Sequence, residues 1–204
     1  MPHRAPSPAA LGRRRHWIFD LDGTLTRPVH DFDAIRRELG VPDQVPILEH
    51  LATLPREQAE PRLARLHAIE RDACARAVAR PGAAALLTAL RERGCDQGIV
   101  SRNSLESVRL TLAAAGLADH FADGDLVGRG EAPPKPDPAG LLKLLEAWSA
   151  AAGDAVMVGD FVHDLEAGRA AGVAVVYLDW EGRGRWSELA DLTVTGLEPL
   201  VALL

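Results

Sequence analysis

The sequence predicts an α/β protein with a Rossmann-like, doubly wound parallel sheet and a small all-helical cap inserted after the first strand. From residue 81 onward, short apolar runs alternate with amphipathic stretches, which is typical of parallel strands joined by helices. Residues 28–79 lack a strand pattern. We therefore expect a core domain formed by residues 15–27 and 80–204, interrupted by a helical cap at residues 28–79.

The first strand is expected in the apolar run that begins at Trp17 and leads into Asp20 and Asp22. Gly23 and Thr24 follow, and an apolar run that enters a polar, glycine-bearing turn is typical of a buried strand leaving the sheet. If the chain turns after Asp20, the two carboxylates can converge on one small volume. Such a pair is costly unless a cation lies between the carboxylates or one of them holds a proton.

The insertion is expected to contain three helical or apolar segments, at residues 31–39, 46–54 and 57–79. In the third segment, apolar residues recur at spacings of three and four, with arginine and glutamate on the other side. Pro61 falls inside this segment, so the helix is expected to start or kink there.

After the insertion, strands and helices alternate. A helix is expected at residues 82–93, and another that Asn103 would cap, with Glu106 three residues further on. Asp137 can cap a third helix with Pro138 at its first position. The expected strands lie at residues 97–101, 125–127, 155–160 and 173–178, with an edge strand at 192–194.

Composition narrows the possible functions. The chain has 204 residues, a net charge of −6 and two distant cysteines, Cys74 and Cys95. A net negative charge argues against a general nucleic-acid binder, and no apolar run approaches the ~20 residues needed to span a bilayer. Residues 1–14 are expected to be a flexible leader with some order near Leu11, and unpaired thiols favour a cytoplasmic protein. The oligomeric state cannot be predicted.

The polar residues of interest all follow expected strands. In doubly wound sheets, ligands bind outside the carboxyl ends of the strands, so these side chains should share one edge. Six of them carry ionisable or hydroxyl groups, in four separate parts of the chain. They are Asp20 with Asp22, then Ser101, then Lys135 in a proline-rich loop, and finally Asp160 followed by Asp164.

This order resembles the four motifs of the haloacid dehalogenase-like (HAD) hydrolase superfamily, and in particular its phosphoglycolate-phosphatase-like members with a small helical cap. The resemblance spans Trp17 to Gly172. It implies that Asp20 is a nucleophile that takes up a phosphoryl group and that Asp22 is a general acid and base. It also implies a Mg²⁺ ion held by Asp20, Asp160 and the backbone carbonyl of Asp22.

These residue types suit the transfer of a phosphoryl group to a carboxylate. A phosphate dianion repels a carboxylate nucleophile, and Mg²⁺ together with Lys135 would offset that repulsion. The Ser101 hydroxyl and the backbone N–H of Arg102, at the start of a helix, can donate to phosphate oxygens. Gly23 and Thr24 would shape the loop, and Asp164 would hold Lys135 or a metal-bound water.

Other interpretations were weighed for several of these residues. Asp160 could merely cap the next helix. His163 lies in the fourth motif, but oxygen ligands suit Mg²⁺ better than imidazole. Phe161 departs from the serine or threonine that often follows Asp160 in the family, which removes a hydroxyl donor. Asn103 and Arg102 could contact substrate.

We therefore predict a magnesium-dependent phosphatase that hydrolyses a small phosphorylated metabolite through an aspartyl-phosphate. A sugar-phosphate mutase of the same superfamily and a non-enzymatic, receiver-like phosphoacceptor remain alternatives. Asp22 argues against a dehalogenase, which needs no acid for its leaving group. A phosphonate hydrolase would need a cap lysine, and residues 28–80 contain none.

The residues that select the substrate are harder to predict. Basic residues of the cap and its connections could meet an anionic group on the substrate, and a second group after residue 178 could line the site from the core side. These candidates are Arg27, His30, Arg36, Arg62 and His67 in the first group, and Trp180, Arg183 and Arg185 in the second.

Overall fold

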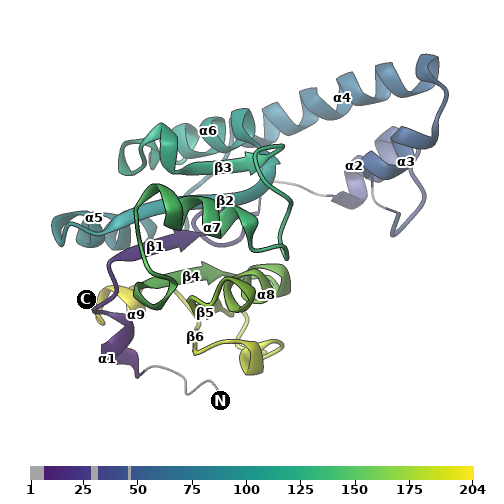
Figure 1. Cartoon of the computed structure of the whole chain (residues 1–204). Helices are drawn as coiled ribbons and strands as arrows, with labels where there is room; N and C mark the ends of the chain where they lie inside the picture. The colour runs from purple at the N-terminus through teal and green to yellow at the C-terminus, as the bar shows by residue number, and fades with distance from the viewer. Residues whose placement is uncertain (1–6, 29–31, 46) are drawn as a thin grey trace.

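A six-stranded, wholly parallel sheet lies between two layers of helices (Figure 1). The computed structural model describes residues 7–28, 32–45 and 47–204. The strand order is β3-β2-β1-β4-β5-β6, the doubly wound order that reverses direction next to β1. This confirms the predicted fold class. The strands are β1 (His16–Phe19), β2 (Asp96–Ser104), β3 (Leu126–Arg129), β4 (Ala155–Gly159), β5 (Ala174–Leu178) and β6 (Leu192–Val194).

Alternating side chains of the strands build a core on each face of the sheet. In β1, Trp17 and Phe19 pack with α5 and α6, whereas Ile18 packs on the other face with α7 and α8. The helices of the sheet domain are α1 (Pro8–Leu11), α5 (Ala83–Glu92), α6 (Leu105–Ala114), α7 (Ala139–Ala147), α8 (Val162–Ala171) and α9 (Glu198–Val201). Short 3-10 turns lie at Ala118–His120, Asp123–Asp125, Ala152–Asp154 and Ser187–Leu189.

Part of the N-terminal segment is helical, around Leu11 where some order is expected. Leu11, in α1, is fully buried against the sheet domain. The carbonyl of Arg14 accepts a hydrogen bond from Trp17 Nε1 at 3.1 Å, and the carbonyl of Gly12 accepts one from Arg93 at 3.2 Å. Leu11 thus joins this short helix to the core, whereas Pro8 and Ala9 stay exposed. Residues 1–6 lie outside the described residues.

The insertion consists of α2 (Phe32–Leu39), α3 (Ile47–Thr53) and α4 (Arg56–Cys74), which extend beyond the end of the sheet (Figure 1). These helices share a small core of their own, which includes Ile35, Leu51 and Leu66, and α4 also contacts α6. The helix α4 begins at Arg56 and continues through Pro61, so the predicted start at Pro61 is wrong.

Two short backbone segments connect the insertion to the sheet domain. The N–H of Arg27 donates to the carbonyl of Val78 at 2.9 Å, and the N–H of Arg80 donates to the carbonyl of Leu25 at 2.8 Å. Between them, Thr26 and Ala79 pair antiparallel. The chain thus enters and leaves the insertion side by side, where residues 25–27 pair with residues 78–80.

Strand β2 is longer than predicted, and this moves the start of the next helix. Ser104 still pairs with Arg129 of β3, after a shift of register beyond Val100. Ser104 is also the N-cap of α6, where its hydroxyl accepts a hydrogen bond from the N–H of Ser107 at 3.2 Å. The predicted cap at Asn103 is therefore wrong, because pairing with β3 keeps residues 101–104 extended.

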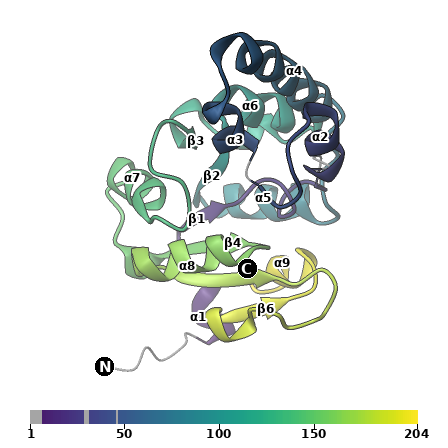
Figure 2. The same cartoon turned by 90° about the vertical axis from the view of Figure 1, so that its right-hand side faces the viewer.

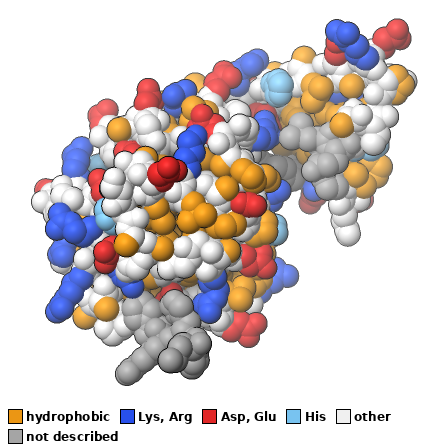
Figure 3. Space-filling model, viewed as in Figure 1, with side chains coloured by type: hydrophobic (Ala, Val, Ile, Leu, Met, Phe, Trp, Pro, Cys, Tyr) orange, Lys and Arg blue, Asp and Glu red, His pale blue; other side chains and the backbone are white. Residues whose placement is uncertain are grey.

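Figure 3 shows basic and acidic side chains interspersed over the visible face of the sheet domain and the insertion. Within the described ranges, no helix combines the length and the apolar character that a membrane span requires.

Candidate active site

The candidate site lies at the carboxyl ends of β1 and β4, the neighbouring strands where the order of the sheet reverses (Figure 2). Asp20 follows β1, and its N–H donates to the carbonyl of Val158 at 3.0 Å, which continues the pairing with β4. Asp160 follows β4 directly. The pairing of the two strands therefore brings these two carboxylates to the same point of the edge.

A buried lysine joins the carboxylates. Lys135 Nζ lies 2.6 Å from Asp20 Oδ1 and 2.7 Å from Asp164 Oδ1. Both Lys135 and Asp164 are buried, and Asp164 Oδ2 also accepts a hydrogen bond from the N–H of Phe161 at 3.1 Å. Carboxylate oxygens of Asp20, Asp160 and Asp164 all lie within 4.8 Å of one another. We call these four side chains the charge cluster.

Burial governs the electrostatics of the charge cluster. It raises the pKa of Asp20 to about 8 against the opposing charge of Lys135, with Asp164 and Asp160 adding to the rise. Burial and the neighbouring Asp164 likewise raise the pKa of Asp160 to about 6. Burial lowers the pKa of Lys135, but the carboxylates of Asp164 and Asp20 outweigh this effect, so the ammonium stays charged.

The loop after β1 positions Asp160. The hydroxyl of Thr24 donates to Asp160 Oδ1 at 3.0 Å. Gly23 adopts a φ of +94°, and a Cβ at this position would lie 2.2 Å from Asp160 Oδ2. Glycine is thus required both by the backbone conformation and by the close approach of the carboxylate. The carbonyl of Gly23 accepts a hydrogen bond from Trp180 Nε1 at 2.7 Å, which ties this loop to the segment after β5.

Asp22 is not one of the three carboxylates of the charge cluster, and its side chain contacts Asn103 and Thr26. The side-chain amide of Asn103 donates to Asp22 Oδ2, and the hydroxyl of Thr26 lies 3.5 Å from Asp22 Oδ1. From the sequence, Asn103 is expected only as a helix cap or a substrate contact. Its contact with Asp22 has no signal in the sequence, because the two residues are 81 positions apart.

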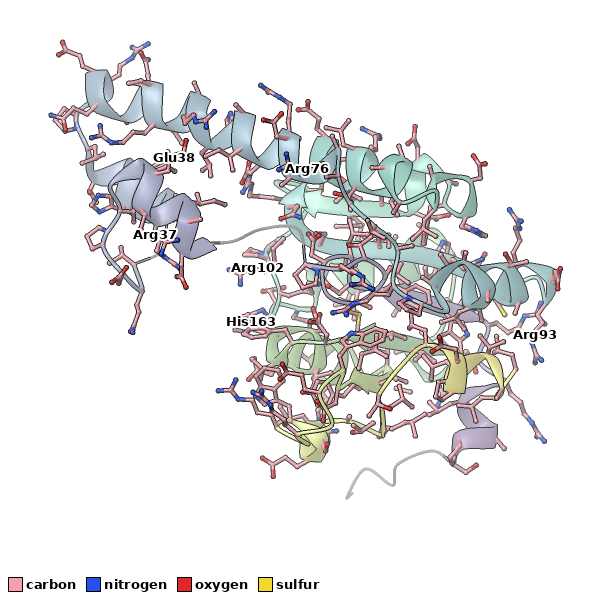
Figure 4. All side chains as sticks on the ribbon, turned by 180° about the vertical axis from the view of Figure 1, so that it is seen from behind. Arg37, Glu38, Arg76, Arg93, Arg102 and His163 are labelled. Atoms are coloured by element: carbon pink, nitrogen blue, oxygen red, sulfur yellow. The ribbon has the colours of Figure 1, made fainter. Side chains whose placement is uncertain are left out.

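The predicted phosphate-binding residues, Ser101 and Arg102, lie within the C-terminal half of β2. Ser101 is buried, and its hydroxyl accepts a hydrogen bond from the N–H of Asn103 at 3.2 Å. Arg102 is exposed and lies with His163 at the edge that faces the insertion (Figure 4). Because α6 begins only at Leu105, the expectation that Ser101 stands at the start of a helix is wrong.

The charge cluster fits a divalent cation. Three carboxylates surround one ammonium, which leaves an excess of two negative charges once all are ionised. Oxygen donors at this spacing are the ligands that Mg²⁺ and Ca²⁺ prefer. His163 is not part of the cluster: its ring packs against Phe161, and Nδ1 lies 3.5 Å from a Glu166 carboxylate oxygen.

Two of the predicted substrate-selecting arginines have structural partners within the insertion. Arg36 donates to the carbonyl of Val45 at 3.2 Å, and Arg62 donates to the carbonyl of Leu39 at 3.2 Å. His67 is exposed, and His30 lies outside the described residues.

This fold and this cluster define a class of α/β enzymes that carry an aspartate and a buried lysine at the switch point of a parallel sheet. A family model of haloacid dehalogenase-like hydrolases matches residues 15–172. The chain therefore belongs to the haloacid dehalogenase-like hydrolase family, as its motifs predict.

Relatives agree with this assignment. A phosphoglycolate phosphatase of Rhodospirillum rubrum is 34% identical over 195 residues, covering 80% of this chain and 78% of its own. An uncharacterized hydrolase of Saccharomyces cerevisiae is 29% identical, covering 92% of this chain and 89% of its own. The fold is shared with the crystal structure of a predicted phosphoglycolate phosphatase from Haemophilus somnus, with a TM-score of 0.78. The two chains are 18% identical, and the match covers 94% of this chain and 98% of the other. The family match and the phosphoglycolate phosphatase relative support assignment of the chain to the phosphoric monoester hydrolases.

Proposed function

We propose that the protein is a Mg²⁺-dependent phosphatase that hydrolyses a small phosphomonoester through a phosphorylated Asp20. The observation that carries this proposal is the charge cluster, in which Lys135 Nζ lies 2.6 Å from the Asp20 carboxylate. The ammonium holds Asp20 in place and offers positive charge to an incoming phosphate. Phosphoglycolate phosphatases among the relatives support a small phosphorylated substrate.

Asp20, Asp160 and the backbone carbonyl of Asp22 would hold the metal ion, with Asp164 beside them. When bound, Mg²⁺ supplies positive charge that balances the carboxylates and polarises the phosphoryl group. Thr24 and Gly23 act through Asp160, whose orientation they fix. The Ser101 hydroxyl and the Arg102 N–H would donate to the oxygens of the transferred phosphoryl group.

The reaction has two steps. A carboxylate oxygen of Asp20 forms a bond to phosphorus while the ester oxygen leaves, and Asp22 gives that oxygen its proton. Asp22 then takes a proton from water, which attacks phosphorus and releases inorganic phosphate and the free Asp20 carboxylate. Hydrogen bonding from Asn103 orients Asp22 for both transfers. The contact of Asp20 with Lys135 and that of Asp22 with Asn103 support this division of roles.

We also propose that α2, α3 and α4 act as a cap over the site. Residues 28–79 connect to the sheet domain only a few residues after Asp20, through the paired segments at Leu25–Arg27 and Val78–Arg80. Short connections of this kind let a cap move as one unit.

The test is hydrolysis of 4-nitrophenyl phosphate by the full chain in Mg²⁺ and in EDTA. We expect turnover in Mg²⁺ only, no turnover in D20N, and retained turnover in D119N, which alters an exposed aspartate outside the site. Turnover in D20N would contradict the nucleophile assignment. A phosphorylated protein without turnover would instead favour the receiver-like phosphoacceptor.

A further inference from the structure

A groove of about 280 Å³ opens beside the charge cluster. Asp160 and the next residue, Phe161, line the groove together with Arg80 and the segment that follows β5. Because Asp160 belongs to the cluster, a molecule bound to the cluster through its phosphate has this space next to it. None of the roles described above uses the groove.

Arg80 is a preorganised cation in the wall of this groove. Its guanidinium carbon lies 4.2 Å from the centre of the Trp180 ring, and its buried Nε has no hydrogen-bond partner. Stacking occupies the face of a guanidinium and leaves the in-plane N–H groups able to bind a carboxylate or phosphate. Both members of the pair are fixed, since Trp180 donates to the Gly23 carbonyl and the Arg80 backbone donates to Leu25.

The acidic residues of the groove already have partners. Glu181 lies 3.0 Å from Arg183, and Asp179 accepts a hydrogen bond from the N–H of Gly184. Among the described residues, no carboxylate forms an ion pair with Arg80 or with Arg185, whose guanidinium lies 5.1 Å from the Trp186 ring centre. With a divalent cation balancing the charge cluster, the groove therefore carries excess positive charge.

Aromatic rings form the apolar part of the groove. Phe161 is 48% exposed although it directly follows a residue of the cluster, and its ring meets the Trp186 ring edge to face at 5.0 Å. Trp186 in turn packs against Tyr177 at 5.7 Å. A flat or apolar carbon skeleton would cover this exposed aromatic surface.

From these observations we infer that the groove binds the leaving group of the substrate, and that this leaving group has a flat or apolar skeleton with a second anionic group bound by Arg80. The inference rests on the proposed function and names its substrate class. The transferred phosphoryl group would lie at Asp20, the skeleton against Phe161, and the second anion on the in-plane N–H groups of Arg80.

Two esters of matched size test this inference. In 4-carboxyphenyl phosphate the leaving group ends in a carboxylate, and in 4-carbamoylphenyl phosphate it ends in a neutral amide. We expect the wild-type enzyme with Mg²⁺ to have a higher kcat/KM for the carboxylate ester. R80Q should lower this preference about tenfold to hundredfold, as expected for a hydrogen-bonded ion pair. R80K should retain part of the preference, because it keeps the charge but not the planar fork.

R91Q is the matched control, since it removes one exposed arginine from α5, outside the groove. Its preference should stay within about twofold of the wild type. Equal kcat/KM for both esters in the wild type overturns the inference and leaves the proposed function standing. The inference is also overturned if R80Q lowers kcat/KM equally for both esters, and the proposed function still stands. Arg80 would then act on the transferred phosphoryl group or on the cap connection. A wild-type enzyme that hydrolyses neither ester nor 4-nitrophenyl phosphate overturns the proposed function itself.

Discussion

Replacing Lys135 by methionine removes the ammonium that lies between Asp20 and Asp164. The Lys135 side chain is 1% exposed, and those of Asp20 and Asp164 are 13% and 4% exposed. Water therefore cannot replace the lost charge. Breaking a buried ion pair from one side typically costs about 3–5 kcal/mol, because the remaining charge stays buried without a partner.

For a chain of this size, each kcal/mol changes Tm by about 2–4 °C, so K135M should melt about 6–20 °C below the wild type in EDTA. The assay is thermal unfolding followed by circular dichroism at pH 8. K143M is the matched control, because Lys143 is the other lysine of the chain, is half exposed and lies 3.7 Å from Glu131. Its stability should change by no more than about 0.5 kcal/mol.

Saturating Mg²⁺ should raise the Tm of K135M part of the way back to that of the wild type, because the cation restores positive charge beside the same carboxylates. Phosphatase activity should not recover, since Lys135 also faces the incoming phosphate. A Tm of K135M within 2 °C of the wild type in EDTA, a margin of about 1 kcal/mol or less, would refute the electrostatic account of the cluster.

Two further predictions concern Asp20 and Trp180. Burial raises the pKa of Asp20 from its usual 3.8 to about 8, so the folded state holds a proton that the unfolded state releases. The free energy of unfolding of the metal-free wild type should therefore fall as pH rises from about 4 to about 8, and that of D20N should fall less. Urea unfolding at pH 5 and pH 8 measures both changes. Equal losses in both proteins would contradict this pKa. W180F removes the 2.7 Å hydrogen bond to the Gly23 carbonyl and should lower stability by about 1 kcal/mol and kcat severalfold. W148F removes a comparable 2.8 Å hydrogen bond to Asp125, away from the site, so it should lower stability and leave kcat unchanged. A normal kcat in W180F would count against a role for the hydrogen bond between Trp180 and Gly23.

The sequence located most strands and helices because their signals are local. Apolar runs bounded by glycine, proline or aspartate mark β1, β4 and β5, and the glycine at position 94 adopts the positive φ expected after the end of α5. Errors arose where a distant partner overrode the local signal. Pairing with β3 extended β2 to Ser104, beyond its predicted end at Ser101.

The sequence by itself determined the fold class, the helical nature of the insertion and the residues that follow each strand. Parallel strands bring their carboxyl ends to one edge whatever the details of packing, so Asp20, Lys135, Asp160 and Asp164 were candidates for one site before any contact was known. The tertiary structure decided which of these side chains touch. Lys135 lies between Asp20 and Asp164, whereas Asp22 is held separately by Asn103.

Trp180, Arg183 and Arg185 were candidates from the sequence, but only the tertiary structure placed Arg80 with them in one groove. Arg80 and Trp180 are 100 positions apart, and neither belongs to a motif. Their stacking depends on how the connection to the insertion and the segment after β5 approach the loop at Gly23. Such contacts follow from the angles at which elements pack, and a linear pattern of residue types carries no information about those angles.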